Sequence, residues 1–527
     1  MHTVLLQIDP PMAGTRTISN GNDYRNRHDN PAGLRTQFRN LAIAFSSVAA
    51  ARANHPALEA GESVFSYEKI SRSARLVSQY LMGRPDFSAG MRVALKLANS
   101  AEYIAAFYGA LLADCVVVPL PVSIEKSRWR HIQKLCSPQV VISRHEDSKD
   151  LKDDSATTLL RIPDLASETR LPAPRRCGDD LAMVLFTSGS TGAPKGVMLS
   201  HSNLLANAES ILQDLPISAD DKALVLVPFC HSFGNSILQT HVLAGATMAV
   251  GADLIFPGSI AQALSEFGAT SFSAIPEIYD KLLKFGKLGE RPLPKLRYMT
   301  VAGGEIRPDT AKEIAARIAP ATFHVMYGQS EAAPRLTSLP PDQLLLRPGS
   351  IGKPIVGVEL AVKDETGSVL PPFEVGMLYA RGENVMLGYW NDPEGTAKVL
   401  DDDGWLQTGD LAYLDDDGFF YLEGRANLLV KIQGHRVHPL EIEEIVEANF
   451  PNTRAIAIPM VRGGETRFAL FVASQNNQPI DMSEIRAACM RELPTYKVPV
   501  HFEVVNELPL TSAYKVDRVA LSLRIPQ

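Results

Sequence analysis

The chain has 527 residues, of which 45% are hydrophobic and 21% are charged, and its formal net charge is −7. At about 150 residues per domain, this length predicts three or four structural units. The apolar fraction excludes a chain that is disordered throughout, and the small net charge gives no basic field for binding DNA or RNA.

The cysteines and the apolar runs exclude further classes of protein. The five cysteines are odd in number, lie far apart and form no Cys-x-x-Cys pair, which disfavours a disulfide framework and a structural zinc site. No stretch reaches the roughly 18 uninterrupted apolar residues of a membrane helix, and the apolar run at the N-terminus is too short for a signal peptide. We therefore expect a soluble, cytoplasmic protein without a membrane span.

Helical and strand-like patterns alternate from about Leu34 to about Gly424, after a polar N-terminal extension at residues 1–34. This alternation is typical of an α/β protein whose sheets are covered by helices. The expected elements, in chain order, are a helix from Ser66 to Leu81, a strand at 91–97, a helix at 102–112, and buried strands at 116–120 and 223–227.

Three further strands end in glycine-rich or polar turns. The strand at 181–186 runs into Thr187–Gly192, the strand at 298–302 into Gly303–Glu305, and the strand at 323–327 into Gly328–Glu331. Ligands of open α/β sheets bind at the carboxyl ends of the strands. The pattern therefore predicts that these three turns face one crevice.

After Gly424 the pattern changes to that of a smaller α+β domain. It predicts a strand at 428–432, a helix that begins at His438-Pro439, strands at 455–458 and 466–473, a helix at 483–491 and a strand at 502–505. We place the boundary at Arg425–Asn427, which gives an extension at 1–34, a large domain at 35–425 and a C-terminal domain at 426–527. The expected fold class is α/β, with a large multi-sheet N-terminal domain of layered α/β subdomains and a small, mobile α+β C-terminal domain.

The strongest local signal is the segment Thr187–Gly196, which reads Thr-Ser-Gly-Ser-Thr-Gly-Ala-Pro-Lys-Gly. Its small and hydroxylated residues leave backbone N–H groups accessible to an anion, and Lys195 adds a compact positive charge. That chemistry suits a polyphosphate. The segment is not a Walker P-loop, because Lys195 lies between Pro194 and Gly196 rather than between Gly and Ser or Thr.

This segment resembles the signature of the adenylate-forming superfamily, which includes acyl- and aryl-CoA synthetases, nonribosomal adenylation domains and firefly luciferase. Further segments match the motifs of that superfamily in the same order along the chain. They are Tyr327–Glu331, Gly404–Asp410, Gly424-Arg425 followed by Lys431–Arg436, and Leu508–Lys515.

The resemblance implies an enzyme that activates a carboxylic acid with ATP as an acyl adenylate, releases pyrophosphate and then transfers the acyl group to the thiol of coenzyme A. Both partners of the first step are anions, so a catalyst needs cations and alignment at the reacting centre. The implied catalytic residues are Lys515, His231 and Thr187, with Lys515 bridging the carboxylate and the α-phosphate. Glu331 would hold Mg²⁺ against the phosphates, as a hard oxygen ligand for a hard ion.

The same resemblance implies the nucleotide-binding residues. Those of the phosphate loop, which would hold the β- and γ-phosphates with Thr187, are Ser188, Gly189, Ser190, Thr191, Gly192 and Lys195. Ser330 would add a hydroxyl, Tyr327 would stack on adenine next to Gly328, and Gly303, Gly304 and Glu305 would form the adenine floor. Asp410 would accept hydrogen bonds from both ribose hydroxyls, assisted by Arg425.

For the second step, the C-terminal domain of the superfamily rotates about a hinge, which falls here on Asn427. The superfamily usually has Asp or Lys at the hinge, and Asn tolerates unusual backbone angles as well. The loop with Lys431 and Gly434 would then face the acceptor tunnel. Tyr514 stands where a Gly usually precedes the catalytic lysine, which restricts that loop but keeps the ammonium group of Lys515.

The segment around His231 bears on the acid. Ser232 falls where amino-acid adenylation domains carry their amine-binding Asp, and a buried ammonium without a carboxylate is costly, so an α-amino acid is disfavoured. His231 resembles the His of acyl- and aryl-CoA synthetases that gates the acid and thiol tunnels. The expected pocket residues, which suit an acid with an apolar or aromatic body, are His231, Phe233, Ser236, Met326, Ala332 and Pro334.

Two alternatives remain open at this point. The acyl acceptor could be the phosphopantetheine of a carrier protein instead of coenzyme A, since both acceptors share all the adenylation residues. The departures at Asn427 and Tyr514 also motivate a catalytically silent nucleotide-binding or regulatory module. Acid-dependent release of pyrophosphate would exclude the silent module, and thioester formation with each acceptor would separate the two ligases.

Overall fold

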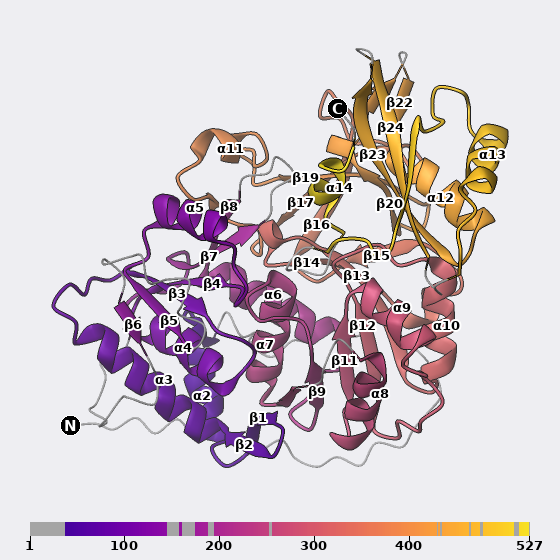
Figure 1. The fold of residues 1–527 in the computed structure, drawn as a ribbon. Helices are drawn as coiled ribbons and strands as arrows, with labels where there is room; N and C mark the ends of the chain where they lie inside the picture. The colour runs from indigo at the N-terminus through magenta and orange to yellow at the C-terminus, as the bar shows by residue number, and fades with distance from the viewer. Residues whose placement is uncertain are drawn as a thin grey trace, which may run out of the picture.

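The computed structural model arranges the chain as two helix-covered sheets and a smaller C-terminal unit (Figure 1). It describes residues 37–144, 158–160, 174–187, 194–251, 256–428, 430–432, 435–462, 465–474, 478–510 and 516–525. The extension predicted at residues 1–34 lies outside these ranges, so its conformation stays a prediction.

Seven of the described strands form one sheet in the order β18-β8-β7-β4-β3-β5-β6. Their bounds are β3 Arg92–Lys96, β4 Val116–Leu120, β5 Val140–Ser143, β6 Thr158–Leu160, β7 Leu181–Thr187, β8 Lys195–Ser200 and β18 Gly388–Tyr389. Every residue of β4 and β5 is buried, as expected for strands with helices on both faces. One face packs against α2 (Leu41–Ala51), α3 (Tyr67–Met82) and α4 (Ala101–Leu112), and the other packs against α5 (Lys126–Cys136).

Thirteen described strands form the second sheet, in the order β16-β17-β19-β20-β15-β14-β13-β12-β11-β9-β10-β1-β2. Its mainly parallel half consists of β1 Pro56–Ala60, β2 Ser63–Ser66, β9 Lys222–Val225, β10 Thr247–Val250, β11 Ser271–Ala274, β12 Tyr298–Val301 and β13 Thr322–Gly328. Its antiparallel half consists of β14 Arg335–Leu339, β15 Ser350–Pro354, β16 Val358–Lys363, β17 Gly376–Gly382, β19 Leu406–Leu414 and β20 Phe420–Arg425. The chain therefore changes from parallel to antiparallel pairing directly after the β13 turn.

Two helices, α6 (His201–Asp214) and α7 (Ser232–Ala244), lie between the sheets, and α6 contacts both β8 and β14 (Figure 1). Helix α6 begins with a capping box, because the Ser200 hydroxyl accepts from the Asn203 N–H while the Asn203 side chain accepts from the Ser200 N–H. The remaining helices of the large part are α8 Pro257–Glu266, α9 Pro276–Lys284, α10 Pro308–Ile318 and α11 Pro393–Ala397.

The C-terminal unit is a three-stranded sheet with helices on both faces. Its strands are β23 Thr453–Arg462, β24 Glu465–Ser474 and β25 His501–Val505, beside the β21 (Val430–Ile432) and β22 (His435–Val437) hairpin. Helices α12 (Pro439–Asn449) and α13 (Met482–Glu492) cover one face, and Leu521 of α14 (Arg518–Ser522) packs on the other. His438 caps α12, and Pro439 occupies its first turn as predicted.

The predicted α/β fold class is confirmed, and the expected elements form with ends shifted by a few residues. Ser66 caps α3 by accepting from the Lys69 N–H, as the sequence pattern indicates. The strand expected at 428–432 is shorter, because Ala426–Leu428 forms a 3₁₀ turn before β21. None of the described helices combines the length and apolar character that crossing a membrane requires.

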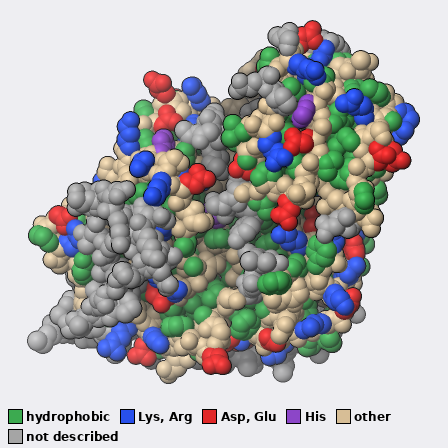
Figure 2. Space-filling model, viewed as in Figure 1, with side chains coloured by type: hydrophobic (Ala, Val, Ile, Leu, Met, Phe, Trp, Pro, Cys, Tyr) green, Lys and Arg blue, Asp and Glu red, His purple; other side chains and the backbone are tan. Residues whose placement is uncertain are grey.

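The charges on the face seen in Figure 2 alternate in sign, with Lys and Arg interspersed among Asp and Glu. The same view shows a notch between the C-terminal unit and the part of the molecule that carries α5 and α11. The site described next lies between these bodies, because residues of both the large sheets and the C-terminal unit line its cavities.

Candidate active site

Two cavities lie side by side where the sheets and the C-terminal unit meet. The first has a volume of about 540 Å³ and the second about 390 Å³. They share Gly303, Gly328 and Arg425 in their walls, so the ends of β12, β13 and β20 form the line along which they meet. The end of β7 also reaches the first cavity through Thr187. The ends of the three strands that precede the predicted turns thus approach one region, although β7 belongs to a different sheet from β12 and β13.

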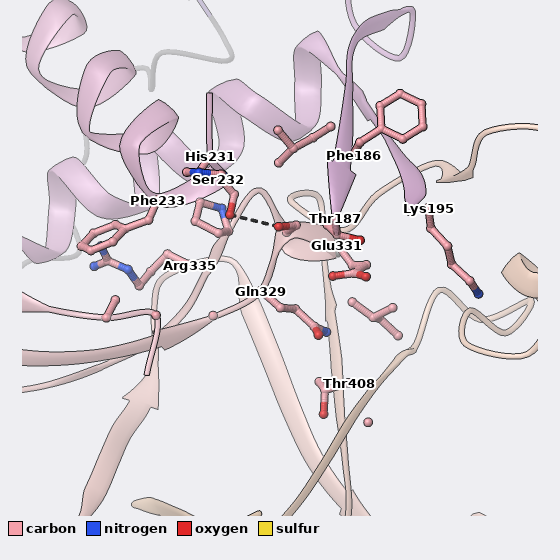
Figure 3. Close-up of a pocket in the computed structure, with 18 of the residues that line it drawn as sticks. Phe186, Thr187, Lys195, His231, Ser232, Phe233, Gln329, Glu331, Arg335 and Thr408 are labelled. Atoms are coloured by element: carbon pink, nitrogen blue, oxygen red, sulfur yellow. Dashed lines mark hydrogen bonds between the residues drawn. The ribbon is translucent and has the colours of Figure 1, made fainter. Parts of the chain in front are cut away.

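The register of β7 and β8 places Thr187 directly opposite Lys195, and both side chains line the first cavity (Figure 3). Lys195 Nζ lies 4.4 Å from the centre of the Tyr389 ring and 3.7 Å from Asp392 Oδ2. The Tyr389 hydroxyl donates to Glu331 Oε1 at 3.0 Å. Tyr389 therefore holds a cation over its ring and an anion at its hydroxyl, which orients Lys195 and Glu331 on the same wall.

The turn after β13 is tied to the start of α7. Ser330 Oγ donates to Ser232 Oγ at 3.0 Å, and this hydrogen bond is the dashed line in Figure 3. His231 is the N-cap residue of α7, and both His231 and Ser232 line the first cavity. The N-terminus of α7, with its positive partial charge, thus lies at the wall of a cavity that has Glu331 on another side.

A hydrogen-bond network around Asp410 lies where the two cavities meet. The β19–β20 register pairs Asp410 with Arg425, and Arg425 Nε lies 2.7 Å from Asp410 Oδ1. The buried Tyr327 hydroxyl donates to Asp410 Oδ2. Burial and the charge of Asp410 raise the pKa of the Tyr327 hydroxyl well above its usual range, so this donor keeps its proton.

The close approach of β13 and β14 requires a glycine at position 328. A Cβ at Gly328 would lie 2.0 Å from the Pro334 carbonyl oxygen, closer than any real contact. The register pairs Gly328 with Arg335, the first residue of β14. The segment from Tyr327 to Arg335 is therefore a tight bend whose two arms are both at the cavity wall.

Most of the predicted site residues are brought together. The first cavity is lined by Thr187, Lys195, His231, Phe233, Gly303, Gly328, Ser330, Glu331, Pro334 and Arg425, and the second by Gly303, Gly304, Glu305, Met326, Tyr327, Gly328, Asp410 and Arg425. The positions outside the described residues are Ser188, Gly189, Ser190, Thr191, Gly192, Gly434, Tyr514 and Lys515. Only the backbone of Asn427 and Lys431 is described, in the 3₁₀ turn and in β21.

Three of the expected pocket residues do not line the first cavity. Ser236 is buried within α7, where its hydroxyl donates to the Phe233 carbonyl at 2.8 Å. Ala332 is fully buried in the turn after Glu331, and Met326 faces the second cavity. Of the six expected pocket residues, His231, Phe233 and Pro334 therefore line the first cavity.

The structure adds residues that the sequence reasoning missed. Arg128 and Gln329 line the first cavity, together with Tyr389, Thr408 and Arg335. Arg335 follows the Tyr327–Glu331 motif by only four residues, which is a signal that could have drawn attention to it. Gln329 and Thr408 lie inside the Tyr327–Glu331 and Gly404–Asp410 motifs, which could have pointed to them, whereas Tyr389 lies in a segment without a motif of its own.

The first cavity is suited to anions. Among the described residues that line it, the cations Arg128, Lys195, Arg335 and Arg425 outnumber the single carboxylate, Glu331. Figure 3 shows Lys195 on one side of the cavity and Phe233 with Arg335 on the opposite side, with Gln329 and Glu331 between them. Such a cavity can hold a phosphate chain and a carboxylate together, because its cations offset the repulsion between the two anions.

Comparison with known proteins agrees with this geometry. The profile of the AMP-binding enzyme family matches residues 45–390. A feruloyl-CoA synthase from an Amycolatopsis species is 30% identical over 471 residues, which are 87% of this chain and 94% of that protein. A long-chain-fatty-acid–CoA ligase from Salmonella typhimurium is 28% identical over 533 residues, covering 92% and 94% of the two chains.

Among solved structures, the ATP-bound MatB from Rhodopseudomonas palustris superimposes with a TM-score of 0.80 at 26% identity, over 91% of this chain and 98% of that one. The chain belongs to the AMP-binding enzyme family, and it is an acyl- or aryl-CoA synthetase-like ligase. The resemblance read from the motifs is thereby confirmed, whereas the role of each site residue is still a proposal.

Proposed function

We propose that this protein activates a carboxylic acid with ATP to an acyl adenylate, releases pyrophosphate, and then transfers the acyl group to the thiol of coenzyme A. The observation that carries this proposal is the pair of cavities that meet at Gly303, Gly328 and Arg425. One has a buried carboxylate for a sugar, and the other has cations and an apolar wall for phosphates and an acid. The family profile and the relatives named as CoA synthase and CoA ligase support the same reaction.

The second cavity fits the adenosine. Asp410 is 4% exposed and fixed by Tyr327 and Arg425, so its oxygens can accept hydrogen bonds from ribose hydroxyls without reorganising. The Tyr327 ring and the backbone of Gly303 and Gly304 line the same cavity and give the base a flat, largely apolar surface. Glu305 lies at the same wall, as the adenine floor requires.

The first cavity fits the phosphates. Thr187 and Lys195 flank the phosphate segment, and Ser330 offers a hydroxyl on the opposite turn. The Glu331 carboxylate beside them has the hard oxygen donors that Mg²⁺ prefers, and one or two such carboxylates with phosphate oxygens form the usual Mg²⁺ site. Bound there, Mg²⁺ would reduce the charge of the phosphates.

The chemistry requires two anions to meet. The substrate carboxylate attacks the α-phosphorus, the bond to the β-phosphate oxygen breaks, and pyrophosphate leaves with its electron pair. Lys195 and the N-terminus of α7 lower the repulsion from within the described site, and Lys515 is the cation that we assign to the bridge between carboxylate and α-phosphate. His231, at the N-cap of α7, would gate the way from the nucleotide to the acid and thiol tunnels.

The transfer step needs a second arrangement of the C-terminal unit. We place the hinge at Asn427, two residues after Arg425, where a 3₁₀ turn separates β20 from β21. Rotation there would remove Lys515 from the site and bring the segment of Lys431 and Gly434 to the acceptor tunnel. Coenzyme A is the acceptor that the relatives' names favour, with a carrier-protein phosphopantetheine as the alternative.

The test uses the purified full-length chain with ATP, Mg²⁺ and a panel of aliphatic and aromatic acids, and it measures pyrophosphate release. We expect release that depends on the acid, followed by thioester formation when coenzyme A is added. Absence of acid-dependent release with every acid would leave only a silent nucleotide-binding module. Thioester that forms with holo-carrier protein and never with coenzyme A would replace the CoA ligase by the carrier-loading enzyme.

A further inference from the structure

The guanidinium of Arg335 is a buried cation on the wall of the first cavity. Arg335 is 3% exposed, and its Nη1 has no hydrogen-bond partner among the described residues. A buried donor of this kind is normally paired, because leaving it unpaired forfeits the hydrogen bonds it would make to water. The pairing group is therefore expected to come from what occupies the cavity.

The backbone around Arg335 is held rigidly. Asn207 accepts from the Arg335 N–H at 3.2 Å and donates to the Arg335 carbonyl at 2.9 Å. Asn384 donates to the same carbonyl at 3.0 Å and to the Ala332 carbonyl at 2.8 Å. Both asparagines are buried, so Arg335 cannot reach water by a small shift of its strand.

The guanidinium keeps its charge at neutral pH. Burial lowers the pKa of Arg335 to about 10, and the nearby carboxylate of Asp214 partly opposes this shift. The shift shows that attraction by Asp214 does not compensate for the loss of water. An anion in the cavity could complete the compensation, because a guanidinium binds a carboxylate with two parallel hydrogen bonds.

The position of Arg335 is separate from the phosphate side of the cavity. Figure 3 shows it next to Phe233, on the side opposite Lys195, with Glu331 and Gln329 between the two. Phe233 and Pro334 are apolar neighbours in the same wall. An acid whose reacting carboxylate meets the nucleotide would therefore extend its body along Phe233 and reach Arg335 with its far end.

We infer that the acid activated by this enzyme carries a second anionic group at its far end, and that the guanidinium of Arg335 binds this group beside Phe233. This inference rests on the proposed function, since it assigns the two ends of one substrate. Arg335 acts here as a specificity-determining residue: it contacts the substrate far from the reacting atoms. A dicarboxylic acid is the substrate class that fits the planar fork best.

The test compares pairs of acids that differ only in the second charge. The pairs are hexanoate with hexanedioate and benzoate with benzene-1,4-dicarboxylate, and acid-dependent pyrophosphate release gives kcat/KM for each. We expect the wild-type enzyme to prefer the diacid of a pair by roughly 10- to 100-fold, the range of one charge-assisted contact. Arg335→Met should abolish or reverse the preference, mainly through KM for the acid, because the lost contact is far from the reacting carboxylate.

Two further variants separate the role of Arg335 from a general loss of charge. Arg335→Lys keeps the charge without the planar fork and should keep part of the preference for the diacid. Arg130→Met removes an exposed arginine of α5 and should leave the preference unchanged. Measuring kcat/KM for 3-sulfopropanoate as well shows whether Arg335 also accepts a sulfonate as the second anionic group. A preference for the carboxylate or for the sulfonate is consistent with anion binding by Arg335.

A binding measurement keeps the inference testable without turnover. Hexanedioate should raise the melting temperature of the wild-type protein more than hexanoate does, and Arg335→Met should remove this difference. Without ligand, Arg335→Met should melt at the same or a higher temperature, because it removes an incompletely paired buried charge. Monoacids that are used better than diacids, or a preference that Arg335→Met does not change, would overturn the inference and leave the adenylation proposal standing. Absence of pyrophosphate release with all acids would instead remove the proposed function.

Discussion

Replacing Tyr327 with Phe removes one hydroxyl and keeps the ring that lines the second cavity. The hydroxyl is buried and donates to Asp410 Oδ2, so its loss leaves one carboxylate oxygen without this donor. Loss of one partner of a buried hydrogen bond costs about 1–3 kcal/mol. A body of this size has an unfolding entropy of about 0.8 kcal/mol/K, so the melting temperature should fall by about 1–4 °C.

The matched variant, Asp410→Asn, changes the acceptor instead of the donor. The amide oxygen can still accept from Tyr327, but the ion pair with the half-exposed Arg425 and the charged acceptor for ribose are lost. Because Arg425 is half-exposed, its ion pair with Asp410 contributes less to stability than a fully buried pair would, so Asp410→Asn should lower the melting temperature only slightly. Binding of ATP should weaken by roughly 10- to 100-fold, because a charged acceptor is replaced by a neutral one.

The two variants are compared by thermal unfolding and by the KM for ATP in the pyrophosphate assay. Tyr327→Phe should lower the melting temperature with a change of only a few-fold in KM, whereas Asp410→Asn should raise KM strongly. Arg347→Met, which alters an ion pair at the β15–β20 end of the sheet, is the control for a general loss of stability. If Tyr327→Phe raised KM for ATP as much as Asp410→Asn while leaving the melting temperature unchanged, our assignment of Tyr327 as the support of Asp410 would be refuted.

Two other predictions concern catalysis and pH. Lys515→Ala should lower adenylation by about three orders of magnitude with little change in ATP binding by equilibrium dialysis, and a variant that adenylates normally would exclude Lys515 as the bridging cation. Burial lowers the pKa of His201 to about 4, and the unfolded chain, with a histidine pKa of 6.5, binds more protons between these values. The free energy of unfolding should therefore fall as the pH drops from 6.5 to 4, by up to about 3 kcal/mol from His201, and His201→Gln should reduce this slope in urea titrations.

The residues that the motifs propose for the nucleotide lie together at the cavities because they come from short contiguous segments. Thr187 and Lys195 come from one hairpin, and Ser330 and Glu331 from one turn, so their order along the chain nearly describes their arrangement. The parallel strands were predicted for a similar reason. A strand covered on both faces, such as β4, is a continuous apolar run that is visible without knowledge of its neighbours.

The acid side could not be predicted in the same way. Ser236 lies three residues after Phe233 on α7, yet its hydroxyl is used inside the helix and only Phe233 reaches the cavity. A single arginine in a sequence is normally exposed, so the burial of Arg335 follows only from the bend between β13 and β14. The antiparallel half of the large sheet was also missed. It combines neighbouring pairs such as β19–β20 with the long-range pair β15–β20, and the order of such pairs is not visible in the apolar pattern of single strands.

Asn384 links the two sides of the site, and this link is testable. Its amide donates to the Ala332 carbonyl, next to Glu331, and to the Arg335 carbonyl, whereas Asn207 contacts the backbone of Arg335 only. Asn384→Ala should therefore lower kcat and raise KM for the acid together, because the turns that carry Glu331 and Arg335 both lose a support. Asn207→Ala should act mainly on KM for the acid. Asn384→Ala removes a donor to the Ala332 carbonyl, and Asn207→Ala removes the acceptor of the Arg335 N–H. Each loss costs about 1–3 kcal/mol, so the melting temperatures of the two variants should fall alike. Equal effects of both variants on kcat would show that the bend responds as one unit, and would contradict a separate support of Glu331 by Asn384.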